Sequence, residues 1–425
     1  MKFLVTGANG FIGSVITENL LTQGHHVVAV GRSVHATASR LNIEYVHQDF
    51  QQSLCSSDWS GILDGVDGVI NCAGILRESR SGEFDTIHEK APLAIAQACK
   101  DKDIRCFVQI SALGDSDDAD FIASKHRFDE KLLKLLPTAL VLRPSVVVSL
   151  RGSYGGSSML RGLAAFPEAL FIPGSGQQQI QPILLEDLAI LVLEGIERSL
   201  QGIIELGGPE AISIKDYMVG LRGWLQIRTR FIFSAPLLLV KSACLIGERF
   251  KAGPLNQTVL TLLESGNVVN DPKPQKQFTH KAVDVIEAMQ YQPSFVQDRW
   301  HAKLFLLQPI IWFLLSVIWL LSAVSGFSAT QGQFAPILSA VGFPAAAHSG
   351  LVMLTSILDL VLGLMLIFRF KERVTLWLML FSTVGYSVLL GMMAPELWLD
   401  PLGGLLKNLA VAPLIMVYMV MRNPR

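Results

Sequence analysis

The chain contains 425 residues, of which 50% are hydrophobic and 17% are charged, and its formal net charge at pH 7 is −1. Charged residues make up about 25% of an ordinary globular protein, so this chain is poor in them. Its apolar content excludes a disordered chain, and its low cysteine content excludes a small disulfide scaffold. No basic run is long enough to contact a phosphate backbone, so nucleic acid is not expected as a partner.

The charges are distributed unevenly along the chain. After residue 300, only seven Lys and Arg and four Asp and Glu occur in 125 residues. The first 300 residues therefore have the composition of a water-soluble domain, and the last 125 that of a membrane domain. All five cysteines lie in the first part without a Cys-x-x-Cys pair, which indicates reduced thiols in a cytosol and no metal site.

The first residues predict a strand, a tight turn and a helix. The sequence TGANGFIG at residues 6–13 follows a short apolar run and opens an amphipathic helix over residues 11–23. In dinucleotide-binding folds the three glycines permit the turn, the approach of a pyrophosphate to backbone amides and close helix packing. The helix N-terminus adds partial positive charge. We therefore predict that a dinucleotide contacts six residues: Gly7, Asn9, Gly10, Phe11, Ile12 and Gly13.

Strands and helices alternate through the first 143 residues. After the first strand, the pattern predicts strands at 26–30, 44–47, 68–71, 106–110 and 139–142, and helices near 52–63, 84–102 and 121–136. This alternation is typical of an α/β fold with a doubly wound parallel sheet, the Rossmann architecture. We assign residues 1–143 to this domain and residues 144–300 to a small substrate-binding portion of the same unit.

The end of the second strand indicates which dinucleotide binds. An NAD-specific fold usually has an acidic residue there for the ribose 2′-hydroxyl, but this sequence reads Gly31-Arg32-Ser33. Because a guanidinium can neutralise a 2′-phosphate, Arg32 favours NADP(H) over NAD(H). A solvated surface arginine is the alternative interpretation of Arg32.

Four apolar stretches near the C-terminus have the length of membrane spans, at residues 304–327, 349–368, 374–393 and 404–421. Lys and Arg flank the first span on its N-terminal side, fill the connection at 369–373 and end the chain, whereas the connections at 328–348 and 394–403 contain none. Because basic residues accumulate on the cytoplasmic side, both termini and the first 300 residues are predicted to face the cytoplasm. The sequence thus predicts an all-α four-helix transmembrane bundle in a bacterial-type inner membrane.

Three features near the membrane have more than one interpretation. Asp359 lies in the middle of the second span, where it is predicted to face the bundle interior. Lys407 either extends to the interface or reaches Asp359 to form a polar site for a quinone or a proton. Residues 231–250 are apolar but contain Pro236, Lys241 and Glu248, which favours a buried or interface-lying helix over a fifth span.

With these motifs identified, the first 300 residues resemble the extended and atypical short-chain dehydrogenase/reductase superfamily. The resemblance is to its NAD-dependent epimerase/dehydratase-like branch and to the NADPH-binding accessory subunit of respiratory complex I. It implies cofactor contacts from Asp49, Ala73 and Gly74. It also implies that Ser111 bonds a substrate carbonyl and that Lys125 holds the nicotinamide ribose. The last 120 residues resemble the DoxX-like four-helix membrane family, notably at Asp359 and in residues 401–408.

One position departs from the pattern of the reductase family. Active members have a tyrosine four residues before the lysine as general acid or base, whereas this chain has Phe121 before Lys125. Phenylalanine has no proton to donate, and general acid–base help contributes about 10² to 10⁴ in rate. Tyr154, His126 or His88 could replace the tyrosine from another direction, although packing or solvation explains each of them more simply.

These observations lead to one main functional expectation and two alternatives. The first is a membrane-anchored NADP(H)-binding oxidoreductase that acts beside the bilayer, on a quinone or another lipophilic acceptor or as part of a membrane complex. The second is a structural or sensing module that binds NADP(H) without turnover. A nucleotide-sugar epimerase or dehydratase ranks last because it needs the missing tyrosine.

Overall fold

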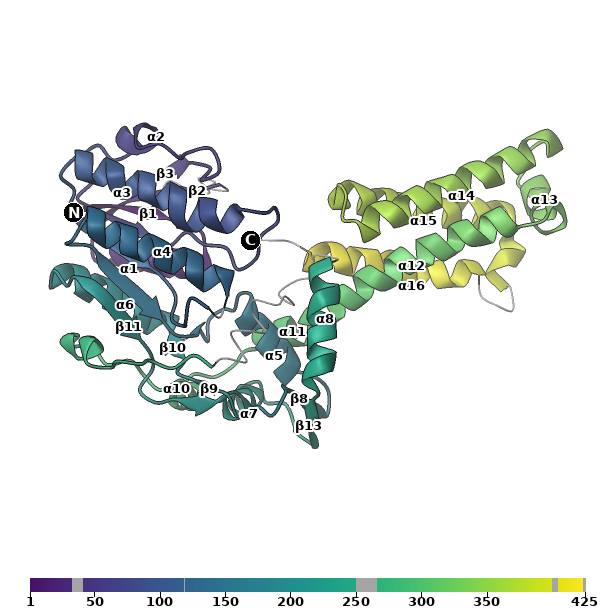
Figure 1. Cartoon of the computed structure of the whole chain (residues 1–425). Helices are drawn as coiled ribbons and strands as arrows, with labels where there is room; N and C mark the ends of the chain where they lie inside the picture. The colour runs from purple at the N-terminus through teal and green to yellow at the C-terminus, as the bar shows by residue number, and fades with distance from the viewer. Residues whose placement is uncertain (33–40, 118, 250–265, 400–403, 423–425) are drawn as a thin grey trace. The chain divides into compact units, whose positions relative to one another are not determined.

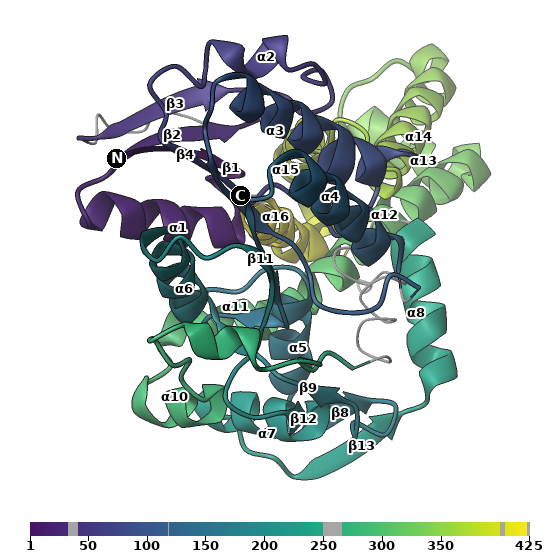
Figure 2. The same cartoon turned by 60° about the vertical axis from the view of Figure 1, so that its left-hand side comes forward.

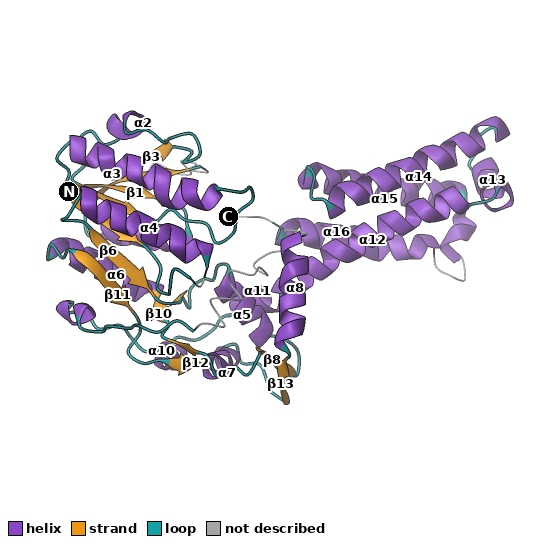
Figure 3. Cartoon of the chain, viewed as in Figure 1, coloured by secondary structure: helices purple, strands orange, loops and turns teal. Residues whose placement is uncertain are grey.

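The computed structural model describes residues 1–32, 41–117, 119–249, 266–399 and 404–422. Two compact units meet between Ala302 and Lys303, an N-terminal unit that contains the strands and a C-terminal unit whose described residues form helices and turns (Figure 3).

A seven-stranded parallel sheet forms the centre of the N-terminal unit. Its order is β11-β6-β5-β4-β1-β2-β3, so the chain runs outward from β1 in one direction and then continues from β4 in the other. The point where the order reverses, between β1 and β4, is where ligands bind in sheets of this type. The strands are β1 (Lys2–Thr6), β2 (His26–Gly31), β3 (Ile43–His47), β4 (Gly68–Asn71), β5 (Cys106–Ile110), β6 (Leu140–Pro144) and β11 (Gly202–Leu206).

Helices cover both faces of the sheet (Figures 1 and 2). Ile16, Leu20 and Leu188 bury one helical layer against it, and Ile95 and Phe128 belong to the core on the other face. The α/β prediction with a doubly wound parallel sheet is therefore confirmed. The helices are α1 (Phe11–Thr22) and α6 (Leu185–Glu197) on the first face, and α2 (Ser57–Ser60), η1 (Asp85–Lys90), α3 (Ala91–Asp101) and α4 (Asp120–Leu135) on the second.

Two predicted helices differ in extent from the observed ones. The helix predicted at 52–63 is only the four-residue α2, because turns follow it up to Gly65, which has a left-handed φ of +68°. The helix predicted at 84–102 starts with the π-helical segment η1 before it continues as α3. Both differences concern local hydrogen bonding that apolar periodicity does not report.

Residues after 144 also contribute to the Rossmann sheet. The strand β11 pairs in parallel with β6, and the helix α6 packs beside α1. The sequence pattern had assigned neither β11 nor α6 to the Rossmann domain. The remaining elements surround a separate core that includes Leu160, Tyr217 and Trp224. They are β7 (Val147–Val148), α5 (Gly156–Ala164), β8 (Ala169–Pro173), β9 (Gln179–Ile180), β10 (Ile183–Leu184), β12 (Ile212–Ser213), α7 (Ile214–Trp224), β13 (Phe231–Ala235), α8 (Leu237–Arg249), η2 (Pro274–Gln277), α10 (Val285–Tyr291) and α11 (Val296–Phe305).

The single helix predicted over residues 231–250 is wrong. Residues Phe231–Ala235 form β13, which pairs with β8, and the helix α8 starts only after Pro236. Proline is tolerated at the start of a helix but not in its interior, so the break falls there. With 13 residues, α8 is also too short for a fifth span.

The C-terminal unit contains four helices of the described chain that are long and apolar enough to cross a membrane, in agreement with the predicted number. Trp312, Leu315, Leu362 and Leu376 lie in their shared core with Tyr418. The helices are α12 (Leu307–Ser328), α14 (Ala345–Ile367), α15 (Glu372–Met393) and α16 (Gly404–Met421), with the shorter α13 (Gln331–Ala340) and η3 (Pro395–Leu399) in their connections.

Candidate functional site

The turn between β1 and α1 admits no side chain at two of its glycines. Gly7 has a φ of +62°, and a Cβ there would lie 3.0 Å from the backbone of Ala73. A Cβ on Gly13 would lie 2.3 Å from the carbonyl oxygen of Gly7. Gly10 caps the helix and donates its amide to the Gly7 carbonyl at 2.8 Å. The start of α1 therefore lies directly against the turn, as a pyrophosphate site at a helix N-terminus requires.

Polar side chains connect the carboxyl ends of the three central strands behind this turn. The Thr6 hydroxyl donates to Asn71 Oδ1 at 2.5 Å, and Asn71 Nδ2 donates to Gln109 Oε1 at 2.6 Å. All three residues are almost completely buried. Gln109 was not among the predicted site residues, although an amide inside the apolar run 106–110 is a signal for it. The chain of bonds fixes the strand ends that support the ligand edge.

The predicted adenosine-binding residues lie at one edge of the sheet. Arg32 follows β2 and is exposed, and Asp49 follows β3 two residues beyond His47. Gly31 and His47 are paired in the register of the two strands, so Arg32 and Asp49 are brought to the same side. The Asp49 carboxylate accepts the amide of Gln51 at 3.0 Å. Ser33 and the residues up to 40 lie outside the described part of the chain.

Lys125 lies beside the loop that follows β4. Its ammonium donates to the carbonyl of Ile110 at 2.8 Å, and a Cβ on Gly74 would be 3.5 Å from Nζ. The side chain is buried, and this burial lowers the pKa of Lys125 to about 8. Burial likewise raises the pKa of the neighbouring Cys72 thiol to about 12, so that cysteine stays protonated. The structure thus places Lys125 next to Gly74, and Gly7 of the glycine turn next to Ala73.

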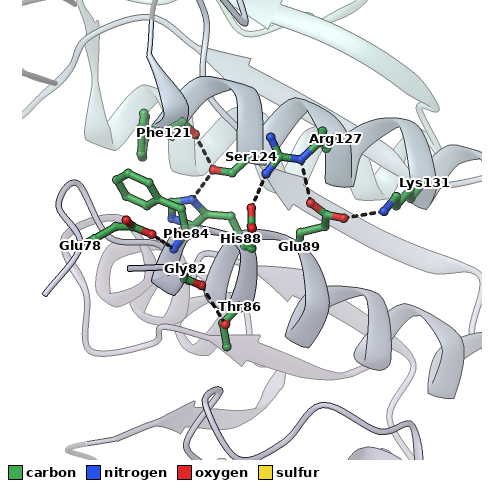
Figure 4. A network of polar contacts seen from close by, with 11 residues as sticks. Glu78, Gly82, Phe84, Thr86, His88, Glu89, Phe121, Ser124, Arg127 and Lys131 are labelled. Atoms are coloured by element: carbon green, nitrogen blue, oxygen red, sulfur yellow. Dashed lines mark hydrogen bonds and ion pairs between the residues drawn. The ribbon is translucent and has the colours of Figure 1, made fainter. Parts of the chain in front are cut away.

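Phe121 lies one turn before Lys125 in α4 and is 9% exposed (Figure 4). Its ring packs edge-to-face against His88 at 5.5 Å and against Phe84 at 6.3 Å between centroids. The Lys125 Nζ lies 5.7 Å from the centroid of the Phe121 ring. The position that a catalytic tyrosine occupies in active reductases is therefore held here by Phe121, which packs in an aromatic cluster with Phe84 and His88.

The three alternative proton donors have other roles in the structure. His88 Nε2 accepts the amide of Ile75 at 3.0 Å, so Nδ1 carries the proton and donates to Ser124 at 2.8 Å (Figure 4). Burial, with the nearby Lys125 ammonium, lowers the pKa of His88 to about 2, which keeps the ring neutral. Burial also lowers the pKa of His126. Tyr154 is exposed and its ring stacks on Phe11, with 6.3 Å between centroids.

The Ser111 side chain bonds to a buried ion pair. Its hydroxyl donates to Asp129 Oδ2 at 2.7 Å, and the same oxygen accepts Arg143 Nε at 2.9 Å. Asp129 is completely buried. Because its proton is used in this bond, Ser111 cannot donate to a substrate carbonyl in this arrangement.

A polar pocket of about 730 Å³ lies beyond this ion pair, at the carboxyl ends of β5, β6 and β11. Charged and amide side chains dominate its wall, among them His126, Arg143, Gln178, Glu205 and Asn267. His126 was among the residues that the sequence pointed to, whereas Gln178, Glu205 and Asn267 are brought here by elements after residue 144. Its volume lies within the range of about 300–1,000 Å³ that is usual for small-molecule pockets.

The C-terminal unit contains a pocket of about 360 Å³ between its spans. Asp359 contributes a carboxylate that accepts the Ser322 hydroxyl at 2.6 Å, and Tyr386 and Asn408 also line the wall. The prediction that Asp359 faces the bundle interior agrees with this placement. Lys407 is exposed and is absent from the lining residues, which favours its interfacial interpretation.

The N-terminal unit has a Rossmann-like α/β fold, and the described residues of the C-terminal unit form a helical domain with four apolar helices. Comparison with known families agrees: residues 7–136 match the NAD(P)H-binding family, and residues 316–416 match the DoxX-like family. Both predicted resemblances are therefore confirmed.

Individual relatives match part of the chain. The chain is 25% identical over 244 residues to a probable low-salt glycan biosynthesis reductase of Haloferax volcanii, which covers 51% of this chain and 78% of that protein. It is 28% identical over 147 residues to NADH dehydrogenase (ubiquinone) 1 alpha subcomplex subunit 9 of Rattus norvegicus, which covers 33% of this chain and 39% of that protein. The solved UDP-glucose 4-epimerase of Thermus thermophilus with NAD has a TM-score of 0.51 at 18% identity, over 68% of this chain and 97% of its own, which shows the shared fold.

Proposed function

We propose that the N-terminal unit binds NADP(H) and transfers hydride to a lipid-soluble acceptor such as a quinone. One observation carries the proposal: Phe121 closes the position of the usual acid, while the glycine turn and Lys125 remain arranged for a dinucleotide. NADPH supplies the hydride and leaves as NADP⁺. A quinone that accepts the hydride takes its proton from water and becomes a hydroquinone, so it needs no donor at residue 121.

The chain's own residues would divide the binding of the cofactor. The amides of the turn around Gly10 and the N-terminus of α1 suit the pyrophosphate. Arg32 suits a ribose 2′-phosphate, which supports NADP(H) over NAD(H), and Asp49 lies at the same edge for the adenosine end. Lys125 suits the nicotinamide ribose beside Gly74.

We also propose that the N-terminal unit and both termini face the cytoplasm of a bacterial-type inner membrane. Basic residues gather at one end of the C-terminal unit, because Arg422 after α16 bonds Glu372 at the start of α15 at 2.6 Å. Arg369, Lys371 and Arg373 flank that bond in the chain. This gathering supports the positive-inside orientation.

The test uses the purified full chain in nanodiscs with NADPH and a short-chain quinone. Loss of absorbance at 340 nm above background is the expected result, and replacing Arg32→Gln should weaken NADPH binding but not NADH binding. Lys125→Met should reduce turnover by at least tenfold, whereas Lys134→Met, an exposed lysine on the same helix, should not. Cofactor binding without any oxidation by quinones would remove the catalytic part of the proposal.

A second candidate function is a nucleotide-binding module that performs no turnover. The neutral His88 and the Ser111–Asp129 bond favour it, because both withhold protons from a substrate. Saturating NADPH would then stabilise the chain by about 2.7 kcal/mol at a hundredfold excess over Kd. A large thermal shift with no reaction towards quinones or carbonyls would select this function. An epimerase or dehydratase ranks below both because of Phe121.

A further inference from the structure

The strand β13 exposes large apolar side chains on both of its faces. Phe231, Ile232 and Phe233 are 50%, 49% and 48% exposed. Successive side chains of a strand point to opposite faces, so three exposed neighbours mean that neither face of β13 is well covered. In Figures 1 and 2, β13 and its partner β8 lie at the end of the N-terminal unit remote from β3.

The exposed apolar surface continues into α8. Leu238 and Leu239 in its first turn are 76% and 64% exposed, and Leu245 is 53% exposed. Aromatic stacking makes the strand part contiguous, because Phe233 stacks on Phe171 at 5.7 Å and on Phe231 at 6.0 Å. An apolar surface of this extent is rare on a water-soluble protein and marks a partner or a membrane.

Positive charge borders this surface. Arg228 and Arg230 are exposed just before β13, and the Arg230 guanidinium lies 5.6 Å from the centroid of the Phe231 ring. One acidic residue, Glu168, is held close by, since its carbonyl accepts the Arg230 amide at 2.9 Å. Aromatic side chains beside arginines suit the interface of a bilayer with anionic headgroups.

The segment that precedes β13 is fixed to the helix that leads into the first span. On α11, Arg299 donates to Gln226 Oε1 at 2.8 Å, and Ala302 lies in the same core as Trp224. Residues just before β13 are therefore bonded to the last helix of the N-terminal unit.

We propose that β13 and the first turn of α8 form a lipid-binding face that rests in the headgroup region and prefers anionic lipids. Phe231, Ile232, Phe233, Leu238 and Leu239 enter the interface, and Arg228 and Arg230 contact lipid phosphates. This face would add a lipid contact to the one that the four apolar helices make. The proposal does not depend on whether hydride transfer occurs.

Fluorescence quenching by lipids tests this proposal on the full chain in nanodiscs. An environment-sensitive fluorophore is attached to a cysteine introduced by Leu238→Cys. The control carries the fluorophore on α10, at a cysteine introduced by Tyr291→Cys. The native side chains at the two positions are almost equally exposed, at 76% and 75%. The background carries Cys55→Ser and Cys244→Ser. Doxyl-labelled lipids should quench the Leu238 probe at least threefold more than the Tyr291 probe, and equal quenching at both would overturn the proposal.

Two further measurements separate the other possible occupants. Nanodiscs with one copy each must retain the quenching at Leu238, since loss of the signal there would assign the face to a second copy instead. Phosphatidylglycerol discs should give stronger quenching than phosphatidylcholine discs, and Arg228→Gln with Arg230→Gln should abolish that difference. Unchanged lipid preference in this double variant would overturn the role of the two arginines. Circular dichroism verifies that every variant is folded.

Discussion

A methyl group at Gly13 is the most direct test of the dinucleotide turn. The new Cβ would lie 2.3 Å from the Gly7 carbonyl oxygen and 2.9 Å from its carbon, and both are backbone atoms. Real Cβ atoms do not approach closer than about 3.0 Å, so α1 must move by at least about 0.7 Å relative to the turn. This movement displaces the amides that face a pyrophosphate.

The expected magnitude follows from that displacement. Overpacking costs about 1–3 kcal/mol of unfolding free energy, which the better helix propensity of alanine offsets by up to about 1 kcal/mol. We expect the NADPH Kd of Gly13→Ala to rise at least tenfold, or about 1.4 kcal/mol. Calorimetry on the chain in nanodiscs measures it. Gly61→Ala is the matched control, because nothing lies within 4 Å of its Cβ position. Native NADPH affinity in a folded Gly13→Ala variant would refute the reasoning.

Three other changes test the inner site. Phe121→Tyr should create carbonyl reductase activity that is absent from the native chain, measured with NADPH and small ketones, if Lys125 and the cofactor are otherwise in place. Lys125→Met should stabilise the chain at pH 7 by up to about 3 kcal/mol, because folding lowers the lysine pKa from 10.5 to about 8. Asp129→Ala should destabilise it by about 3 kcal/mol, since Arg143 loses its buried partner.

The lysine prediction has a defined pH dependence. In the unfolded chain the amine keeps a proton up to about pH 10.5, whereas in the folded chain it loses that proton near pH 8. The unfolded state therefore binds more protons between these values, and the native chain gains stability as pH rises through this window. Denaturation measured at pH 7 and at pH 10 should show that the stability gained by Lys125→Met is smaller at pH 10 than at pH 7. An advantage of constant size would contradict the burial of the charge.

For Asp129→Ala, a stability change as small as that of the exposed Glu130→Ala would contradict the ion pair.

Local sequence determined much of the dinucleotide turn and of the membrane helices. Gly7, Gly10 and Gly13 are recognisable because a tight turn and a close helix impose residue size directly on neighbouring positions. The number of membrane spans could also be predicted from the sequence, because each span needs about 20 consecutive apolar residues, whatever the rest of the fold is. In both cases the requirement acts over a few residues of contiguous chain.

Tertiary structure alone decided the surroundings of the reacting position. Ser111 was expected to bond a substrate carbonyl, and in the structure its hydroxyl donates to Asp129, which lies 18 residues later in the chain. The strand β11 could not be assigned to the sheet because its pairing with β6 joins residues 62 positions apart in the sequence. The apolar run after Arg230 was predicted as one helix. In the structure its first part pairs with β8 as the strand β13, and a helix begins only after Pro236. The side chains of β13 are therefore exposed and not buried in a helical core. These features depend on contacts between residues that are far apart in the sequence. Neither partner of such a hydrogen bond or ring contact carries a local sequence pattern that predicts it.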